Sequence, residues 1–262
     1  MLKATGVKKT FFPGSVNEKR ALRGVDLTLE DGDFVTVIGS NGAGKSTFLN
    51  AIAGVFPIDS GSIEVGGIDI SNMPEYKRAQ YIGRVFQDPM RGTAANMMIE
   101  ENMAMASRRG RRLGLRWSSQ PAQTEKFRDM LKQLDLGLEE RMTAHVGLLS
   151  GGQRQALTLL MATLVRPQLL LLDEHTAALD PKTAAKVLEI TDRLVTTQKL
   201  TTLMITHNMR DALRYGNRLV RMHQGRIVVD VSAEEKKNLT VPDLLALFEK
   251  GAGVVSDAMM LS

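Results

Sequence analysis

The sequence contains no cysteine, which fits a reducing compartment but does not establish one, because many extracytoplasmic proteins also lack cysteine. It also lacks any run close to the ~18–20 uninterrupted apolar residues that a membrane-spanning helix needs. The most apolar segment, 156–165, is interrupted by Thr158 and Thr163. The first six residues have no apolar stretch ahead of their lysine, so we expect no signal peptide. Any role at a membrane would therefore depend on a partner.

The composition is typical of soluble globular proteins, because 43% of the 262 residues are hydrophobic and 24% are charged. This length suits one domain, or one domain with an inserted subdomain. The net charge of +5 could indicate an anionic partner. However, the dense basic cluster, Arg108–Arg112 with Arg116, has only Trp117 as a neighbouring aromatic residue. We therefore interpret it as a solvated loop and expect no nucleic-acid partner.

Three short apolar runs, 33–38, 169–173 and 200–205, are each followed by a segment typical of a turn and a helix. This order predicts a parallel α/β sheet. The second run is apolar at every position before its final aspartate, which suits a strand buried on both faces. Ligands of open α/β sheets bind at the carboxyl ends of the strands, so a carboxylate pair directly after this run would lie at a binding edge.

Strand-like runs disappear between Pro89 and about Arg166, where helical spacing occurs at 99–106 and 123–136. We interpret this segment as an inserted helical subdomain. Near the end of the chain the pattern predicts a strand and then a helix; these are residues 226–231 and 242–250, with Thr240 as the helix cap. The predicted organisation is a core formed by 1–88 and 166–250, a helical insert at 89–165, and a tail at 251–262.

A glycine-rich segment follows the first predicted strand and matches the pattern G-x-x-x-x-G-K-[ST] of phosphate-binding loops. It consists of Gly39, Ser40, Asn41, Gly42, Ala43, Gly44, Lys45, Ser46 and Thr47. Glycines let successive backbone N–H groups turn toward a polyphosphate at the start of a helix. Lys45 would neutralise β- and γ-phosphate charge, and Ser46 would bind Mg²⁺. The flanking strand and helix patterns disfavour the alternative, a simple glycine turn.

Two carboxylates, Asp173 and Glu174, close the leucine-rich strand. In a phosphate-loop enzyme, one carboxylate at this place holds Mg²⁺ and the next can polarise the attacking water. We assign Asp173 to the metal and Glu174 to the water. Acidic residues also mark ordinary strand ends, so this assignment depends on the phosphate loop upstream.

A second candidate anion-binding element is Leu149–Gln153, with the sequence Leu-Ser-Gly-Gly-Gln, directly before a helical pattern at 154–165. Ser150 suits a helix cap, and the glycines leave backbone N–H groups open to an anion. Taken alone, this segment would be an ordinary capped helix start. Together with the phosphate loop, it predicts a second phosphate contact.

These motifs resemble, in their order, the nucleotide-binding domain of the ABC ATPase superfamily, and the similarity covers nearly the whole chain. The family signature is matched without a substitution, which implies that these residues contact the nucleotide: Ser150, Gly151, Gly152 and Gln153. The resemblance further implies that Gln87 contacts Mg²⁺ and the water, and that His207 contacts the γ-phosphate. Asp180 would belong to the D-loop.

The sequence departs from the family pattern at two places. Phe11 occupies the place of the family's adenine-stacking aromatic residue, but the adjacent Phe12 is an alternative, because the stretch to Val25 is longer than in many relatives. Position 175 is histidine where many relatives have proline. His175 is close enough in sequence to Glu174 to alter the pH response of that carboxylate.

The resemblance implies a fold and an activity. The fold would be an α/β P-loop NTPase core with a mixed, largely parallel sheet, an antiparallel β subdomain and an inserted α-helical subdomain. The activity would be Mg-ATP hydrolysis in an ATP-sandwich homodimer, in which the signature of one subunit closes on the ATP held by the phosphate loop of the other.

The implied partners are transmembrane permease subunits and an extracytoplasmic substrate-binding protein, which would place the chain at the cytoplasmic face of the cell membrane. A single nucleotide domain without a spanning helix resembles importer ATPases. The segments 17–19 and 86–89 look most like those of ATPases paired with branched-chain-amino-acid-type permeases.

A soluble ABC ATPase of the iron–sulfur assembly type is the alternative function. The DNA-repair type is disfavoured because the sequence has no sustained heptad, and the ribosomal type because it normally carries two ATPase domains. The signature, and the lack of an N-K-x-D base-reading motif, disfavour a P-loop kinase or GTPase. The transported substrate would contact the partners, so this sequence does not specify it.

Overall fold

The computed structural model describes residues 1–110 and 121–251. Arg111, Arg112, Arg116 and Trp117 of the basic cluster and residues 252–262 of the predicted tail lie outside the described residues. The chain divides into two compact units, one formed by 1–78 with 199–262 and the other by 79–198.

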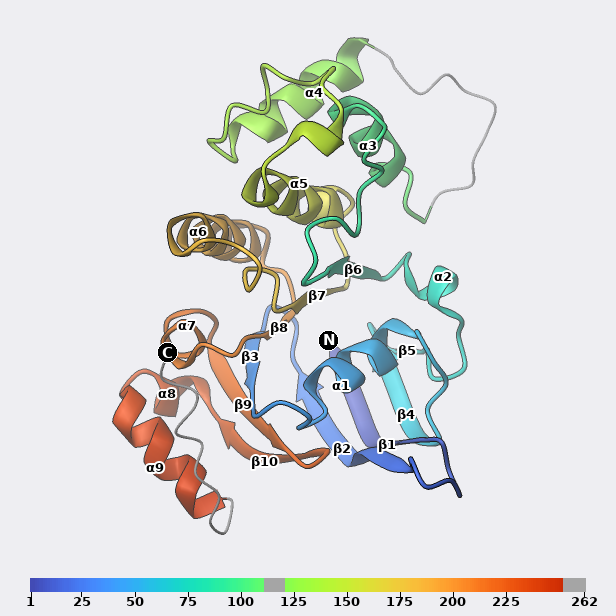
Figure 1. The fold of residues 1–262 in the computed structure, drawn as a ribbon, viewed down its shortest axis with the longest axis vertical. Helices are drawn as coiled ribbons and strands as arrows, with labels where there is room; N and C mark the ends of the chain where they lie inside the picture. Colours follow the sequence, from blue (N-terminus) through green and yellow to red (C-terminus); the bar gives the residue numbers. More distant parts are fainter. Residues whose placement is uncertain (111–120, 252–262) are drawn as a thin grey trace. The chain divides into compact units, whose positions relative to one another are not determined.

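The first unit contains an antiparallel sheet of strand order β2-β1-β4-β5 and the strands β10-β9-β3-β8 of a mixed sheet (Figure 1). The strands are β1 (Leu2–Phe11), β2 (Lys19–Leu29), β3 (Phe34–Ile38), β4 (Ser60–Val65), β5 (Ile68–Asp69), β8 (Thr202–Ile205), β9 (Arg218–His223) and β10 (Arg226–Val231). The helices are α1 (Lys45–Ala53), α2 (Glu75–Arg78), α7 (Met209–Arg214), α8 (Ala233–Lys236) and α9 (Val241–Gly251). Strand β3 is parallel to β8 and β9, and β10 is antiparallel to β9.

The second unit combines two parallel strands with the longer helices of the chain. Its elements are β6 (Ile82–Val85), α3 (Ile99–Ala106), α4 (Pro121–Lys132), the 3-10 turn η1 (Val146–Leu148), α5 (Gly151–Leu164), β7 (Leu169–Asp173) and α6 (Pro181–Gln198). The four leucines of β7 are fully buried, as the continuous apolar run predicts. This unit is larger than the predicted insert at 89–165, because β6, β7 and α6 group with the helices. The predicted domain boundaries therefore remain a proposal.

The predicted elements agree closely with the structure. The predicted strands at 169–173 and 226–231 are β7 and β10, and the predicted helix at 99–106 is α3. The helix predicted at 154–165 begins earlier, at Gly151, because the preceding serine and a glutamine in the first turn form a capping box. The helix predicted at 123–136 is α4, which ends at Lys132.

Arg109 corrects the interpretation of the basic cluster as a purely solvated loop. Its Nη1 donates a hydrogen bond to the carbonyl of Ala162 at the end of α5, at 2.7 Å. Burial lowers the pKa of this guanidinium below its usual value. Arg109 is thus part of the packing of the second unit rather than a fully hydrated side chain.

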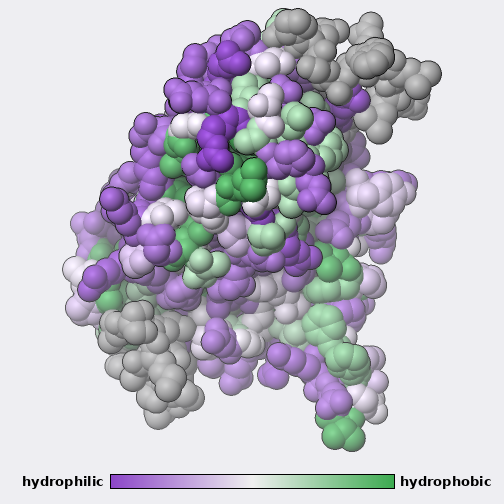
Figure 2. All heavy atoms as spheres, turned by 45° about the horizontal axis from the view of Figure 1, so that its top comes forward, coloured by the Kyte–Doolittle hydropathy of each residue, from purple (hydrophilic) through white to green (hydrophobic). Residues whose placement is uncertain are grey.

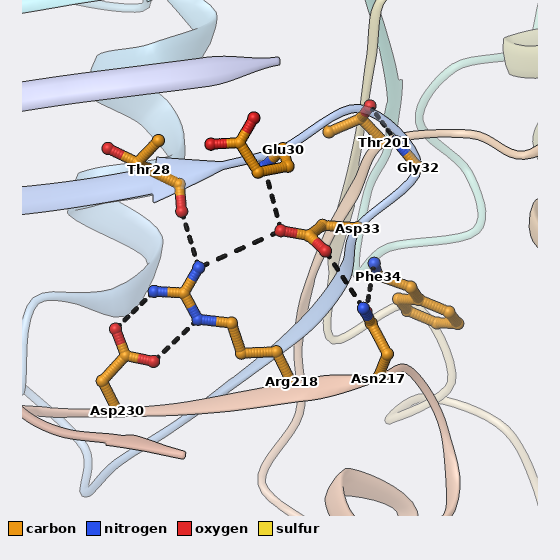
Figure 3. A network of polar contacts seen from close by, with 9 residues as sticks. All are labelled: Thr28, Glu30, Gly32, Asp33, Phe34, Thr201, Asn217, Arg218 and Asp230. Carbon is orange, nitrogen blue, oxygen red and sulfur yellow. Dashed lines mark hydrogen bonds and ion pairs between the residues drawn. The ribbon is translucent and has the colours of Figure 1, made fainter. Parts of the chain in front are cut away.

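A polar network fixes the start of β3 in the first unit (Figure 3). Arg218 donates to both carboxylate oxygens of Asp230 and to the carbonyl of Thr28. Asp33 lies 4.0 Å from Arg218 and accepts a hydrogen bond from Asn217 at 3.0 Å. The hydrogen bond to Asp230 is the main cause that raises the pKa of Arg218. Because this network lies at the amino ends of the parallel strands, it supports the sheet at the edge opposite to the phosphate loop.

Among the described residues, no helix is long and apolar enough to cross a membrane. On the face seen in Figure 2, hydrophilic residues predominate and hydrophobic ones lie in small groups. Large exposed apolar side chains include Phe12, Met90 and Leu148. Exposed apolar residues in small groups are normal for a protein surface and by themselves identify no interface.

Candidate functional site

The phosphate loop connects β3 to α1 and packs against the turn between β9 and β10. A Cβ atom at Gly39 would lie 2.3 Å from the carbonyl oxygen of Met222, and one at Gly44 would lie 2.7 Å from that of Ala21. Both glycines also have positive φ angles, 153° and 102°. The loop therefore requires glycine at these two positions, because a side chain would collide with neighbouring backbone.

Lys45 is the first residue of α1, and its side chain is only 6% exposed. Its Nζ donates to the carbonyl of Gly39 at 2.6 Å and to that of Ser40 at 3.3 Å. The ammonium group is therefore held against the loop at the start of the helix. The first N–H groups of a helix lack intrahelical acceptors and, together with an ammonium group, suit a polyphosphate. Ser46 is exposed in the same turn.

His207 lies at the same edge of the mixed sheet as the phosphate loop. Strand β8 is parallel to β3 with Ile205 opposite Val37, and the N–H of Thr206 donates to the carbonyl of Val37 at 3.1 Å. The chain then reaches His207, which is exposed, and Asn208 caps α7. In the first unit, the predicted γ-phosphate contact and the phosphate loop thus follow neighbouring parallel strands at the same edge of the sheet.

Gln87 and Glu174 lie at one edge of the strand pair in the second unit. The parallel register places Val85 opposite Leu172, so each predicted residue comes two positions after its paired strand residue. Gln87 is exposed, whereas Glu174 is partly buried. The common edge follows from the parallel pairing, because the carboxyl ends of parallel strands meet at the same side of a sheet.

The backbone of Glu174 has a φ of 43°, in the left-handed region that non-glycine residues seldom adopt. Such conformations persist where the surrounding structure imposes them, and they cluster at active sites. The preceding Asp173 has its Oδ2 atom 4.0 Å from Nη2 of Arg84. The unusual backbone conformation therefore occurs at Glu174, the predicted water-polarising residue. The ion pair involves Asp173, the predicted metal ligand.

His175 faces the interior of the second unit and contacts α6. Thr191 donates its hydroxyl proton to the carbonyl of Val187 at 2.8 Å. The 2.9 Å contact between Nε2 of His175 and the Thr191 hydroxyl oxygen is therefore donated by the histidine. Burial lowers the pKa of His175 to about 4. The ring is thus neutral near pH 7, so its titration does not tune Glu174 there.

The depressed pKa of His175 predicts a pH dependence of stability. The pKa of His175 in the folded protein, about 4, lies below the reference value of 6.5, so the unfolded chain takes up a proton first as the pH falls. The free energy of unfolding is therefore highest above pH 6.5 and decreases as the pH falls toward 4. We expect a loss of about 1 kcal/mol at about pH 5.5 relative to pH 7.5. His175→Gln retains a donor but does not titrate, so urea unfolding should show a flatter pH dependence. Identical pH profiles of stability in the two proteins would contradict the lowered pKa of His175.

Ser150 is the N-cap of α5, as its position in the predicted signature indicates. Its hydroxyl oxygen accepts from the N–H of Gln153 at 3.3 Å, and the Gln153 side chain accepts from the N–H of Ser150 at 3.2 Å. The amide nitrogen of Gln153 also donates to the carbonyl of Leu136 at 3.2 Å. Gln153 is therefore engaged within the unit, whereas the Ser150 hydroxyl is exposed and donates to no acceptor in residues 1–110 and 121–251.

Asp180 and Gly152 both lie near Thr183, in the first turn of α6. A Cβ atom at Gly152 would lie 2.0 Å from a methyl carbon of Thr183, so only glycine permits this packing. Asp180 accepts a hydrogen bond from the N–H of Thr183 at 3.1 Å. Hydrogen bonds from the Thr183 side chain and then its backbone lower the pKa of Asp180, which keeps the carboxylate ionised. The predicted D-loop thus leads into a capped helix beside the signature.

The two candidate adenine-stacking residues differ in their surroundings. The Phe11 ring packs edge-on against Phe56, with the centroids 5.1 Å apart, and the Lys9 ammonium lies 5.6 Å from the Phe11 centroid. Phe12 is 68% exposed and has a positive φ of 51°. Both aromatic rings therefore remain candidates, with Phe11 the better supported by its neighbours.

Two buried polar residues of the second unit were not predicted from the sequence. Asn102 is fully buried and exchanges hydrogen bonds with the N–H and carbonyl of Ala94, at 2.8 and 3.1 Å. Arg154 is 3% exposed and donates to the carbonyl of Val146, at 2.8 Å. Polar side chains among apolar helical positions were the available signal, but each partner lies eight residues away, outside the helix that carries the side chain. Asn102 thus holds the segment that follows Gln87, and Arg154 holds the turn that precedes the signature.

The predicted residues fall into two groups, one in each compact unit. The first group contains Phe11, the phosphate loop from Gly39 to Thr47, and His207. The second contains Gln87, Ser150, Gly151, Gly152, Gln153, Asp173, Glu174 and Asp180. Each group presents hydrogen-bond donors or carboxylates at the ends of strands or the starts of helices, an arrangement suited to binding and hydrolysing a nucleotide.

Comparison with known proteins identifies the same family as the sequence motifs. A family model described as ABC transporter matches residues 22–177. The chain is 45% identical over 250 residues to a tyrosine transport ATP-binding protein of Clostridioides difficile (strain R20291), covering 95% of this chain and 99% of that protein. It is 32% identical to the spermidine/putrescine import ATP-binding protein PotA of Shigella flexneri serotype 5b (strain 8401), covering 94% of this chain and 62% of PotA.

Solved structures agree with this result. The TM-score is 0.75, at 26% identity, with a dimeric ATP-binding cassette in a post-hydrolysis state bound to ADP and phosphate, covering 89% of this chain and 99% of that one. It is 0.76, at 27% identity, with the ADP conformation of an ATP-binding cassette of an ABC transporter, covering 95% and 98%. These neighbours confirm the expected P-loop NTPase fold. The chain therefore belongs to the ABC transporter family, as an ATP-binding and ATP-hydrolysing subunit.

Proposed function

We propose that this chain is the ATPase subunit of an importer that works with separate transmembrane permease subunits and transports an amino acid. The observation that carries the proposal is the 45% identity to a tyrosine transport ATP-binding protein over 95% of this chain. A methionine import ATP-binding protein of Enterococcus faecalis (strain ATCC 700802 / V583), 35% identical over 85% of this chain, supports the amino-acid class. An extracytoplasmic binding protein would deliver the substrate, and this chain would lie at the cytoplasmic face of the membrane.

The phosphate loop and three oxygen ligands would hold Mg-ATP. The Ser46 hydroxyl, the Asp173 carboxylate and the Gln87 amide oxygen are hard donors of the kind that Mg²⁺ prefers. Their small number suits a metal that keeps water and phosphate oxygens as its other ligands. Bound Mg²⁺ would supply charge neutralisation at the phosphates. Lys45 would contribute its positive charge to the β- and γ-phosphates.

Hydrolysis would depend on residues that follow the strands. Glu174 would polarise the attacking water, and the strained backbone at this residue supports that role. His207 would contact the γ-phosphate, where its exposed position beside the phosphate loop suits the role. Phe11 would stack on the adenine ring, and Asp180 would support the site through the loop before α6.

A second copy of the chain would complete each ATP site. The hydroxyl of Ser150 already accepts a hydrogen bond from a backbone N–H, so its proton can be donated to a γ-phosphate oxygen. The adjacent glycines would add backbone donors at the start of α5. Two ATP molecules would thus lie between two subunits, and their hydrolysis would open the dimer to drive the permease.

Copurification would test the transporter assignment. A tagged chain purified from detergent-solubilised membranes of its own host should retain a polytopic membrane protein, identified by mass spectrometry. Deletion of this chain should abolish uptake of radiolabelled tyrosine or another amino acid, and the wild-type chain should restore it. Recovery with soluble iron–sulfur assembly proteins, and unchanged uptake, would instead support the alternative function, which the relatives do not favour.

A further inference from the structure

A buried glutamine joins the signature helix to the segment that carries Gln87. Gln155 on α5 is fully buried, and its Nε2 donates to the carbonyl of Phe86 at 2.8 Å. The orientation of the amide follows from this contact, because only the nitrogen end can donate to a carbonyl. The Oε1 atom is buried and has no hydrogen-bond partner among the described residues.

Phe86 is held from its ring as well as from its backbone. The guanidinium carbon of Arg84 lies 4.5 Å from the ring centroid, and that of Arg91 lies 4.9 Å from it. Guanidinium groups at these distances attract the π face of an aromatic ring. The Phe86 carbonyl belongs to the peptide group that also contains the N–H of Gln87. A donor that fixes this peptide therefore fixes the point from which the Gln87 side chain projects.

The neighbouring Arg154 contacts the segment that follows Gln87 and the turn that precedes the signature. Its Nη1 contacts the sulfur of Met90, and its Nη2 donates to the carbonyl of Val146 at 2.8 Å. Val146 opens the 3-10 turn that leads to Ser150. Two consecutive residues of α5 thus connect the segment 86–90 to the signature within one compact unit.

We propose that Gln155 is a positioning residue for ATP hydrolysis, which couples the placement of Gln87 to the signature helix that begins after Ser150. This inference rests on the proposed nucleotide roles of Gln87 and Ser150. The buried amide oxygen that lacks a partner disfavours the folded state and offsets the gain from the single hydrogen bond to Phe86, so stability alone is a weak reason for glutamine here. An apolar residue of similar length would fill the same space and remove the unpaired Oε1, but it would lose the donor to the Phe86 carbonyl.

The substitution Gln155→Met separates positioning from stability. Methionine has a similar length and flexibility but cannot donate to the Phe86 carbonyl. We expect kcat to fall by about 10- to 100-fold, because a small misplacement of catalytic groups has effects of this size. The KM for ATP should stay within about twofold. The melting temperature of the full chain should change little, because loss of the hydrogen bond to the Phe86 carbonyl is offset by removal of the buried, unpaired amide oxygen.

Thr163→Val is the matched control on the same helix. Thr163 is also buried, but within the part of the chain that the structure describes its hydroxyl bonds only to the carbonyls of Leu159 and Leu160 in α5 itself. Loss of this hydroxyl should leave kcat within about twofold of wild type. An equal loss of kcat in both variants would show that any buried polar group of α5 matters and would overturn the proposal.

A double-mutant cycle tests whether Gln155 acts through Gln87. In a Gln87→Ala background, Gln155→Met should change kcat by less than about twofold, because the group that it positions is already absent. The proposal would be overturned if the two substitutions reduced kcat independently, so that their fold-changes multiplied in the double variant. It would also be overturned if Gln155→Met had a normal kcat, or if its lower kcat came with a lower melting temperature. Failure of the wild-type chain to hydrolyse ATP would instead remove the proposed nucleotide roles, and this inference with them.

Discussion

Glu174→Gln should lower the rate of ATP hydrolysis by about 100-fold or more, because it removes the carboxylate that we propose polarises the attacking water. ATP binding should persist, since Lys45, Ser46 and Asp173 are retained. Glutamine has the same length and takes the left-handed conformation at no greater cost than glutamate, so the backbone at φ 43° should survive. Single-turnover hydrolysis and equilibrium binding of ATP, measured on the same preparation, separate the two effects.

The same variant should reveal the dimer. With hydrolysis blocked, ATP would remain between the phosphate loop of one subunit and Ser150 of the other, so the protein should dimerise with ATP and stay monomeric with ADP. Size-exclusion chromatography with light scattering at micromolar protein measures this, with Mg²⁺ omitted in a parallel run to block residual turnover. A variant that binds ATP tightly but remains monomeric would count against the sandwich. A dimer that survives a further Ser150→Arg substitution would exclude the signature as its lid.

Lys45→Ala should abolish turnover chiefly by weakening ATP binding, by about 100-fold, since a charge-assisted hydrogen bond contributes about 3 kcal/mol. The buried ammonium donates hydrogen bonds to the carbonyl groups of Gly39 and Ser40, which hold it at the start of α1. Folding should survive, because the glycines and the bond from the N–H of Gly225 to the carbonyl of Ala43 still hold the loop.

Lys3→Ala is the control for charge. Lys3 is exposed on β1, so its loss lowers the net charge by the same amount without touching the loop. Fluorescent-nucleotide titration and thermal unfolding should distinguish the two variants, with normal affinity expected for the control. Near wild-type affinity and turnover in Lys45→Ala would show that the phosphate-loop assignment is wrong.

The elements that carry the chemistry could be predicted because they depend on short-range sequence. The phosphate loop lies between a buried strand and a helix, as its pattern requires, and Ser150 caps α5. The leucine run of β7 has a continuous apolar sequence, which indicates burial on both faces. The strands of the antiparallel sheet were expected only from the family resemblance, since β1 and β2 pair through several register shifts that no simple alternation predicts.

Contacts between distant segments could not be predicted from the residues. The sequence places His175 beside Glu174, but packing turns its ring toward Thr191 and lowers its pKa to about 4. Arg109 was expected in solvent, yet its guanidinium bonds to the end of α5. Burial and the identity of a hydrogen-bond partner depend on what the rest of the chain brings to that place, and a local pattern contains neither.

The sequence alone was enough to predict which residues would bind phosphate, hold Mg²⁺ and polarise water, because these tasks require particular side chains at fixed spacings within a few residues. Tertiary structure alone decided how those residues are supported. The N–H of Gly225 holds the phosphate loop, and Gln155 holds the peptide before Gln87 from a helix far along the chain. Such supports use common residue types whose role appears only when folding brings distant backbone groups within hydrogen-bonding distance.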